Sequence, residues 1–257
     1  MIDATEMVSV GRRQNILSDE NVSEIVELLN TDDKNSKRVS IEDVAENEYV
    51  LNPSRYLQQE TVVKNGVLFE IVIKNITRGA QIKASVLDEI VSDEPTNIQY
   101  LMLANLQDGI ISDELPYLKE IDSKYEKYCI KNGSLVISKN ASPVKMAIVS
   151  VQEGKKILAN GNLYVIELDT DKINPYFLKA YLESENGKAA LSRVAVGATL
   201  LNLPVEGLKK VIIPLPDLES QKKIADQYYA KLSEIKELKY KLEKATEELE
   251  HIYTEEK

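Results

Sequence analysis

The chain has 257 residues, of which 42 are acidic and 32 are basic, and its formal net charge is −10. A single cysteine and a single histidine exclude a disulfide framework, a zinc cluster and a cysteine–histidine catalytic pair. The sequence contains no apolar run of about 18 residues and no signal-peptide core, so we expect a cytoplasmic protein without a membrane partner.

The charges are unevenly distributed along the chain. Residues 61–216 balance 18 basic against 18 acidic side chains, whereas residues 1–60 and 217–257 are both acidic. An overall negative charge argues against binding to nucleic acid through net charge alone, but a neutral segment can still bind phosphates through local basic clusters. The residue patterns change at the same places, so we expect three structural parts.

Residues 1–60 are predicted to form a small helical segment. Ser18 is a plausible N-cap for an amphipathic helix, in which Val22, Val26 and Leu29 recur at helical spacing, and Ser40 opens a second short helix. The segment holds too few apolar residues for a core of its own. We therefore expect it to pack against another part of a larger protein.

Residues 61–216 alternate short apolar runs with turn signals, which predicts a mixed α+β domain with a curved sheet. The runs predicted as strands are 67–76, 98–106, 127–130, 133–138, 145–151 and 162–168. The dipeptides predicted to turn the chain are Arg78-Gly79, Asp108-Gly109, Asn132-Gly133 and Asn160-Gly161. A helix, or a pair of short helices, is expected over residues 174–194.

Residues 217–257 are predicted to form one long helix. The β-branched run 211–213 indicates a strand, which Pro214 and Pro216 end because proline cannot donate to a ladder. Asp217 then lies where an N-cap oxygen is needed. No glycine or proline follows as far as Tyr253, so about 36 residues at about 1.5 Å each predict a helix of roughly 54 Å.

The helix carries an apolar seam whose members are spaced alternately three and four residues apart, which is the period of a coiled coil. The predicted seam consists of Ile235, Leu238, Leu242, Ala245, Leu249 and Ile252. The seam continues almost to the end of the chain, so we expect a partner helix and a homodimer. The alternative is that the helix lies on its own domain.

The stretch "GATLLNLPVEGLKKVIIPLPDLESQKKIADQY", residues 197–228, resembles the end of a target-recognition domain in the specificity subunits of type I restriction–modification systems. The residues that carry this resemblance are Gly197, Leu201, Asn202, Leu208, Ile213, Pro214, Pro216, Gln221, Ile224 and Ala225. The stretches at 132–149 and 173–182 resemble earlier parts of the same domain. The resemblance spans about residues 61–255.

Residues 1–60 resemble instead the C-terminal tail of a type I adenine-N6 DNA methyltransferase subunit. The family's Asn/Asp-Pro-Pro-aromatic motif is absent, because the similar stretch 52–56 lacks the second proline, and no glycine-rich cofactor loop is present. We therefore expect no enzyme activity and no cofactor in this chain, with S-adenosylmethionine bound by a missing methyltransferase domain. We also expect a fragment of a longer fusion, in which Met1 is an added start within a strand.

The resemblance implies an α+β fold: a curved-sheet target-recognition domain over 61–216, the long helix over 217–257 and the helical tail over 1–60. It implies that the domain reads one half of a bipartite DNA target, while the helix sets the spacing and docks the methyltransferase. Double-stranded DNA and a methyltransferase domain or subunit are the implied partners. The sequence leaves open the target, a restriction subunit and the orientation of helix pairing. A coiled-coil module that binds only protein is the alternative.

Candidate DNA-binding residues follow from the chemistry of phosphates and base edges. The residues predicted to contact phosphates are Lys139, Lys145, Lys155, Lys156 and Arg193. The residues predicted to read bases are Arg78, Gln81, Asn140, Asn160, Thr199 and Asn202. Two of them have alternative, structural interpretations, since Asn160 could serve only a hairpin turn and Asn202 could fix a turn or strand.

Overall fold

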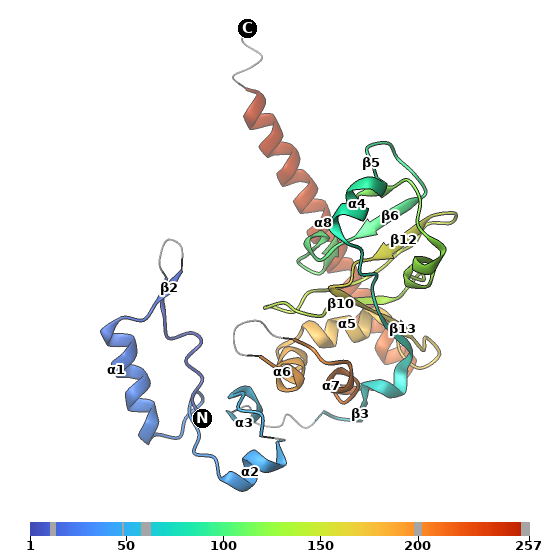
Figure 1. Cartoon of the computed structure of the whole chain (residues 1–257). Helices are drawn as coiled ribbons and strands as arrows, with labels where there is room; N and C mark the ends of the chain where they lie inside the picture. The colour runs from blue at the N-terminus through green and yellow to red at the C-terminus, as the bar shows by residue number, and fades with distance from the viewer. Residues whose placement is uncertain (11–13, 48, 58–62, 198–201, 253–257) are drawn as a thin grey trace.

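The computed structural model describes residues 1–10, 14–47, 49–57, 63–197 and 202–252 (Figure 1). An N-terminal helical segment is followed by a mixed domain of strands and short helices, and one long helix ends the described chain. The predicted fold class, α+β with a long C-terminal helix and a small helical N-terminal segment, is confirmed. Residues 63–216 are called the central domain below.

The N-terminal segment has short elements joined by loops. Its elements are β1 (Ser9–Val10), β2 (Asn15–Ile16), α1 (Asp19–Glu27), a 3₁₀ turn (Leu28–Asn30), α2 (Ile41–Glu46) and α3 (Ser54–Leu57). Ser18 and Ser40 cap α1 and α2 as predicted, and each exchanges hydrogen bonds with the residue three positions on. Helix α1 has no buried residue, and Val26 and Leu29 are 52% and 64% exposed.

The first sheet of the central domain is antiparallel, in the order β11-β10-β13-β4. Its strands are β4 (Ile73–Arg78), β10 (Leu135–Ser138), β11 (Met146–Ile148) and β13 (Leu163–Leu168). Alternate residues of one strand point to opposite faces, so Leu135 and Ile137 join one core cluster while Val136 joins another. The sheet is therefore covered on both faces.

The second sheet has the order β12-β6-β9-β5, and β12 runs parallel to β6. Its strands are β5 (Val91–Ser92), β6 (Ile98–Leu101), β9 (Tyr117–Leu118) and β12 (Lys156–Ala159). A shared cluster joins Leu101 and Ala159 of this sheet to Val136 and Val165 of the first sheet. This cluster packs the two sheets together into one domain.

The smaller elements complete the central domain. They are β3 (Gly66–Leu68), α4 (Ala84–Ile90), β7 (Leu106–Gln107), β8 (Ile110–Ile111), α7 (Val205–Lys209), β14 (Ile212–Pro214) and 3₁₀ turns at Phe69–Val72, Leu103–Asn105 and Ser123–Tyr128. Strand β14 pairs with β3 and ends at Pro214, as the proline brake predicts.

Four predicted strands are wrong in part. The run 67–76 is interrupted by the turn Phe69–Val72, because that turn buries both Phe69 and Val72 in the core. The run 98–106 ends as a strand at Leu101, and the first two residues of the run 127–130 belong to the turn Ser123–Tyr128. The runs 133–138 and 162–168 are confirmed as β10 and β13, whereas only 146–148 of the run 145–151 form a strand, β11.

Helices α5 (Pro175–Glu183) and α6 (Glu185–Val194) confirm the predicted helix pair, and Ser184 caps the second one. They cover the face of the first sheet opposite the second sheet. Helix α5 also packs along the first part of α8, where the rings of Tyr176 and Tyr229 meet edge to face at 4.9 Å. The long helix is thereby anchored on the core.

Helix α8 (Leu218–His251) has 34 residues, or roughly 50 Å at about 1.5 Å per residue. Asp217 is its N-cap, as predicted, and accepts a hydrogen bond from the Ser220 N–H at 2.9 Å. Gln221 and Ala225 are buried, whereas every residue described at 240–250 is exposed. Figure 1 shows the C-terminal part of α8 extending away from the central domain.

The predicted seam lies on this extending part. The exposed fractions are 39% for Ile235, 58% for Leu238, 67% for Leu242, 68% for Leu249 and 64% for Ile252, and Ala245 is also exposed. The described part of the chain does not cover this seam. Helix α8 lies on its own domain as far as Lys239, whose side chain still pairs with Asp108, and the residues described beyond it are exposed.

Candidate nucleic-acid interface

The turn between β12 and β13 is built by an asparagine. The Asn160 side-chain oxygen accepts from the Asn162 N–H at 2.9 Å, and its Nδ2 donates to the Tyr100 hydroxyl at 2.6 Å. Tyr100 is 1% exposed, and burial raises the pKa of its phenol. Asn160 therefore holds the turn, as its structural interpretation predicts, and it fixes the turn to the second sheet.

The loop after β4 packs closely on this turn. Arg78 Nε donates to the Gly161 carbonyl at 2.7 Å, and the Ala80 N–H donates to the Ala159 carbonyl at 2.7 Å. A Cβ at Gly79 would collide with the Asn160 carbonyl, and one at Gly161 would lie 2.7 Å from Cγ of Gln81. Glycines at these two positions allow the loop and the turn to touch.

Arg78 and Gln81 face each other across this contact, and both are exposed. With the Gln81 amide turned so that its oxygen faces the guanidinium, Nη1 of Arg78 donates to it at 2.7 Å. The pair presents a planar group of donors beside an amide. These are the groups that recognise guanine and adenine edges in the major groove.

The loop between β10 and β11 joins the same edge. The Lys139 N–H donates to the Asn162 carbonyl at 2.8 Å, and the Lys139 carbonyl accepts from the Leu203 N–H at 2.9 Å. Asn140 and Asn202 face each other in an antiparallel bridge. Their side-chain Oδ1 atoms are buried and have no hydrogen-bond partner within the described part of the chain.

These contacts place six predicted residues along one continuous edge, which is called the recognition strip below. The recognition strip consists of Arg78, Gln81, Lys139, Asn140, Asn160 and Asn202. It offers the cations of Arg78 and Lys139 and the exposed amide of Gln81, which can donate to phosphates and pair with base edges. The Asn160 amide is engaged within the turn, and the side-chain oxygens of Asn140 and Asn202 are buried. Thr199 was also predicted here, but it lies in 198–201, outside the described residues.

Three predicted residues, Lys155, Lys156 and Arg193, lie elsewhere, whereas Lys145 ends the β10–β11 loop that begins at Lys139. Lys156 is at the opposite end of β12 from Asn160, where its ammonium pairs with Glu126 at 2.8 Å and this contact raises the pKa of Lys156. Lys155 lies beside it and donates to the Thr96 carbonyl at 3.4 Å. Lys145 precedes β11, and its N–H donates to Ser138 Oγ at 2.9 Å. Arg193 is on α6.

Arg193 lies where the N-terminal segment meets the central domain. Its backbone carbonyl accepts from Arg55 Nε at 2.6 Å, and the Ser192 carbonyl lies 3.4 Å from Nδ2 of Asn52. Arg193 thus belongs to the contact between α3 and α6 rather than to the recognition strip.

Sequence reasoning missed Asn162, whose exposed side chain lies in the turn between Asn160 and Lys139. A second asparagine just after the Asn160-Gly161 turn signal was a usable hint, because asparagine is common in turns and matches base edges equally well. The contacts between the hairpin β7–β8 and α8 were also missed. They depend on pairing between distant segments, which leaves no local pattern in the sequence.

The described residues contain no group of three or more His, Cys, Asp or Glu side chains placed to hold a metal ion. Cys129 is half-buried, and burial raises the pKa of its thiol. In the described part of the chain, no helix is both long and apolar enough to cross a membrane.

The chain belongs to a known family. The family model described as the type I restriction modification DNA specificity domain matches residues 33–248, which is most of the chain. This membership agrees with the resemblance of residues 61–255, and the match also covers residues 33–60 of the segment that resembles a methyltransferase tail. No curated protein is similar enough to this sequence to count as a match.

Three solved structures are similar. One is described as showing complex assembly and conformational transition of the type I restriction–modification system; it is 17% identical with a TM-score of 0.51, covering 91% of this chain and 53% of that chain. The S subunit from M. genitalium is 14% identical with a TM-score of 0.43, and the match covers 66% of this chain and 40% of that chain. The HsdS subunit from Thermoanaerobacter tengcongensis is 16% identical with a TM-score of 0.44, covering 85% and 49%.

The first of these likenesses supports the fold described above. This chain spans about half the length of these three solved chains, since the matches cover between 40% and 53% of each of them.

Proposed function

We propose that this chain reads one half of a bipartite double-stranded DNA target for a type I-like restriction–modification methyltransferase. The recognition strip carries the proposal, because loops from three places in the sequence bring donors and acceptors to one edge of the domain. Arg78 and Gln81 are assigned to base edges and Lys139 to a phosphate. Lys145, Lys155, Lys156, Arg193 and Thr199 remain candidate contacts.

In this proposal two copies of the chain pair through the exposed seam of α8. One chain holds one recognition strip, so a two-fold dimer would read two half-sites of a split, symmetric target. The length of α8 would set the distance between them. A sequence seam of period 3.5 and side chains that are 58–68% exposed from Leu238 to Ile252 support this assignment.

The N-terminal segment is assigned to a methyltransferase partner. Several of its apolar side chains are exposed, among them Val26, Leu29 and Ile41, which fits a tail that packs on a larger body. S-adenosylmethionine would bind that methyltransferase domain or subunit, and this chain would supply no catalytic residue. A restriction subunit is a further candidate partner, and the assembly would work on cytoplasmic DNA.

The test is selection of bound duplexes from a random pool, followed by titration of the enriched duplex at several salt concentrations. We expect an enriched motif and an affinity that falls steeply with salt. Binding without any enriched motif would contradict the proposal. Association with protein only, without DNA binding, would favour the alternative of a coiled-coil interaction module.

Matched variants separate base reading from phosphate contact. Arg78→Lys keeps the charge but loses the planar fork, so discrimination at one base pair should fall by about 1–3 kcal/mol with the salt slope unchanged. Lys139→Ala should weaken binding to all sequences and reduce the salt slope by about one. Lys131→Ala is the control, because Lys131 pairs with Glu167 at the other end of β13.

A further inference from the structure

The hairpin β7–β8 reaches from the second sheet to α8. Its turn residues Asp108 and Gly109 have φ angles of 51° and 74°, which fits the Asp-Gly two-residue turn that favours tight hairpins. The root of the hairpin is fixed, because Leu106 is 1% exposed and Ile111 packs against the cluster between the two sheets. The hairpin is therefore a rigid projection.

The tip of the hairpin covers a buried ionic cluster where α5 meets α8. The side chain of Lys179 is fully buried, and its ammonium lies 2.8 Å from Glu183 Oε1 and 2.6 Å from the Tyr228 hydroxyl. Burial lowers the pKa of Lys179. A Cβ at Gly109 would lie 2.6 Å from Lys179 Nζ and 2.9 Å from Glu183 Oε1. Glycine lets the hairpin tip rest on this cluster.

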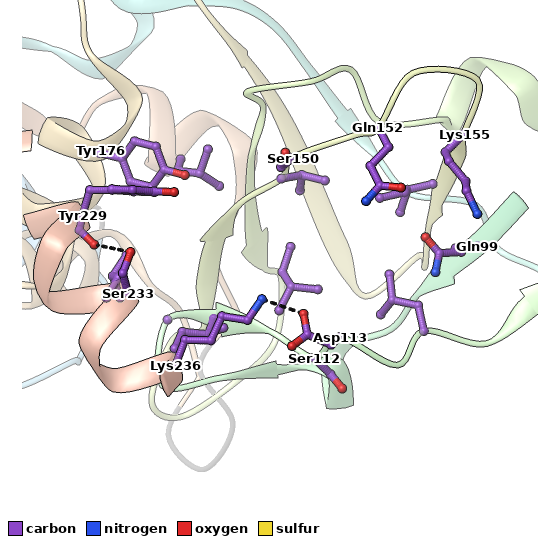
Figure 2. Close-up of a pocket in the computed structure, with 18 of the residues that line it drawn as sticks. Gln99, Ser112, Asp113, Ser150, Gln152, Lys155, Tyr176, Tyr229, Ser233 and Lys236 are labelled. Carbon is purple, nitrogen blue, oxygen red and sulfur yellow. Dashed lines mark hydrogen bonds and ion pairs between the residues drawn. The ribbon is translucent and has the colours of Figure 1, made fainter. Parts of the chain in front are cut away.

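The hairpin contacts α8 again further along the helix. Asp113, which lies two residues after β8 and is counted with the hairpin below, pairs with Lys236 at 2.6 Å, and Asp108 in the turn pairs with Lys239. Figure 2 shows the Asp113–Lys236 pair beside a hollow of about 440 Å³ that separates α8 from the second sheet. From Tyr228 to Lys239 the helix rises roughly 16 Å at about 1.5 Å per residue, so the contacts are spread over several turns.

These contacts leave the seam uncovered. At about 100° per residue, Lys236 and Lys239 share one face of α8, and Leu242 and Leu249 lie roughly 100° around the helix from the middle of that face. Exposed ion pairs contribute little to the free energy of unfolding, so we assign the two ion pairs to the positioning of α8. The hairpin contacts one side of α8 and leaves the adjacent side, which carries the seam, free to contact another helix.

We propose that the hairpin β7–β8 is a strut that fixes the direction in which α8 leaves the central domain. Asp108 and Asp113 hold the shaft of the helix, and Gly109 seats the tip on the Lys179 cluster. Resting on the proposed function, this makes the three hairpin residues positioning residues for target spacing, because the direction of α8 sets where the second reader lies.

The test is the distance between spin labels at Glu94→Cys, beside the second sheet, and Glu248→Cys, near the end of α8, in a Cys129→Ser background. Both label sites are exposed, and neither belongs to the seam. Gly109→Asn tolerates a positive φ but adds a side chain against the Lys179 cluster. Gly154→Asn is its control, since Gly154 has φ 74° with nothing within 4 Å of an added Cβ.

A second pair of variants tests the ion pairs. Asp108→Asn/Asp113→Asn removes two charges from the hairpin, whereas Glu234→Gln/Glu237→Gln removes two charges whose partners are on α8 itself. We expect the distance distribution to shift or broaden in the hairpin variants and to keep its wild-type width in both controls. Unchanged distributions in both hairpin variants, with melting temperatures like those of the controls, would overturn the strut.

A DNA-binding experiment tests the positioning role separately from the label distances. On duplexes with half-sites at varied spacing, hairpin variants should bind a wider range of spacers, while affinity for a single half-site stays within about twofold of the wild type. An altered label distance without altered spacer preference would overturn the positioning role. Failure of the wild-type chain to bind DNA would refute the proposed function and leave the strut to be judged by the label distances.

Discussion

The two halves of α8 are both rich in charge and both carry apolar residues, yet their surroundings are opposite. The first half packs on α5 and buries Gln221 and Ala225, whereas the second half leaves Leu242 and Leu249 67% and 68% exposed. The first half therefore acts as part of the domain core. The second half has apolar spacing without a core to bury it, which is typical of a helix that pairs with another helix.

The largest effect is expected in the anchored half, from Gln221→Leu. Gln221 accepts from the Asn174 N–H at 2.8 Å and donates to the carbonyls of Lys172 and Pro216 at 3.0 and 2.8 Å. Leucine would leave these buried groups without partners, so we expect a loss of about 3 kcal/mol or more in the free energy of unfolding. Chemical denaturation of the whole chain measures it.

The exposed Gln227 provides the matched control for this prediction. Gln227→Leu should change the free energy of unfolding by less than about 0.5 kcal/mol. Equal losses in the two variants would mean that the first half of α8 is not anchored through Gln221.

An intermediate effect is expected in the free half, from Leu242→Asp/Leu249→Asp. Charges in the seam should abolish dimerisation, because an unpaired buried carboxylate is costly, while the melting temperature of the central domain should stay the same at low protein concentration. Light scattering after size exclusion measures the mass. Tyr240→Asp, on an exposed position outside the seam, should leave the dimer intact.

The smallest effect is expected at the start of α8. The Ser220 N–H holds the pKa of Asp217 below its ordinary value, so this cap stabilises the fold above the ordinary pKa and is lost as the pH falls through the lowered value. Asp217→Ala should lower the melting temperature slightly at about pH 7, and this difference from the wild type should disappear as the pH falls through the lowered pKa of Asp217.

Asp217→Asn separates the cap from its charge, because asparagine caps helices about as well as aspartate does. This variant should melt near the wild type at neutral pH and keep its cap in acid. A fall in its melting temperature equal to that of Asp217→Ala would contradict the assigned role of the cap.

The difference between local and distant contacts explains which parts of the fold can be predicted from the sequence. Local signals such as the Ser18 and Asp217 caps and the Asp108-Gly109 turn predict their elements, because each depends on a few neighbouring residues. The run 67–76 was wrongly predicted as one strand, because burial of Phe69 and Val72 by distant segments outweighs the strand propensity of the run.

The predicted site residues likewise divide into those that the fold brings together and those that it places apart. The residue types that match base edges were found from the sequence, and Arg78, Gln81 and Asn160 come together because Gly79 and Gly161 permit close approach. Lys155 and Lys156 were grouped with them by chemistry alone. The parallel pairing of β12 with β6, which places these two lysines at the far end of the strand, has no local signature in the sequence.

In the proposed assembly, two recognition strips held by paired α8 helices read one split target. Sedimentation equilibrium of the whole chain with its selected duplex measures how many chains bind each duplex. We expect two chains on each duplex for the wild type, and one chain on each duplex for Leu242→Asp/Leu249→Asp. A wild-type complex with one chain per duplex at saturation would contradict the paired readers.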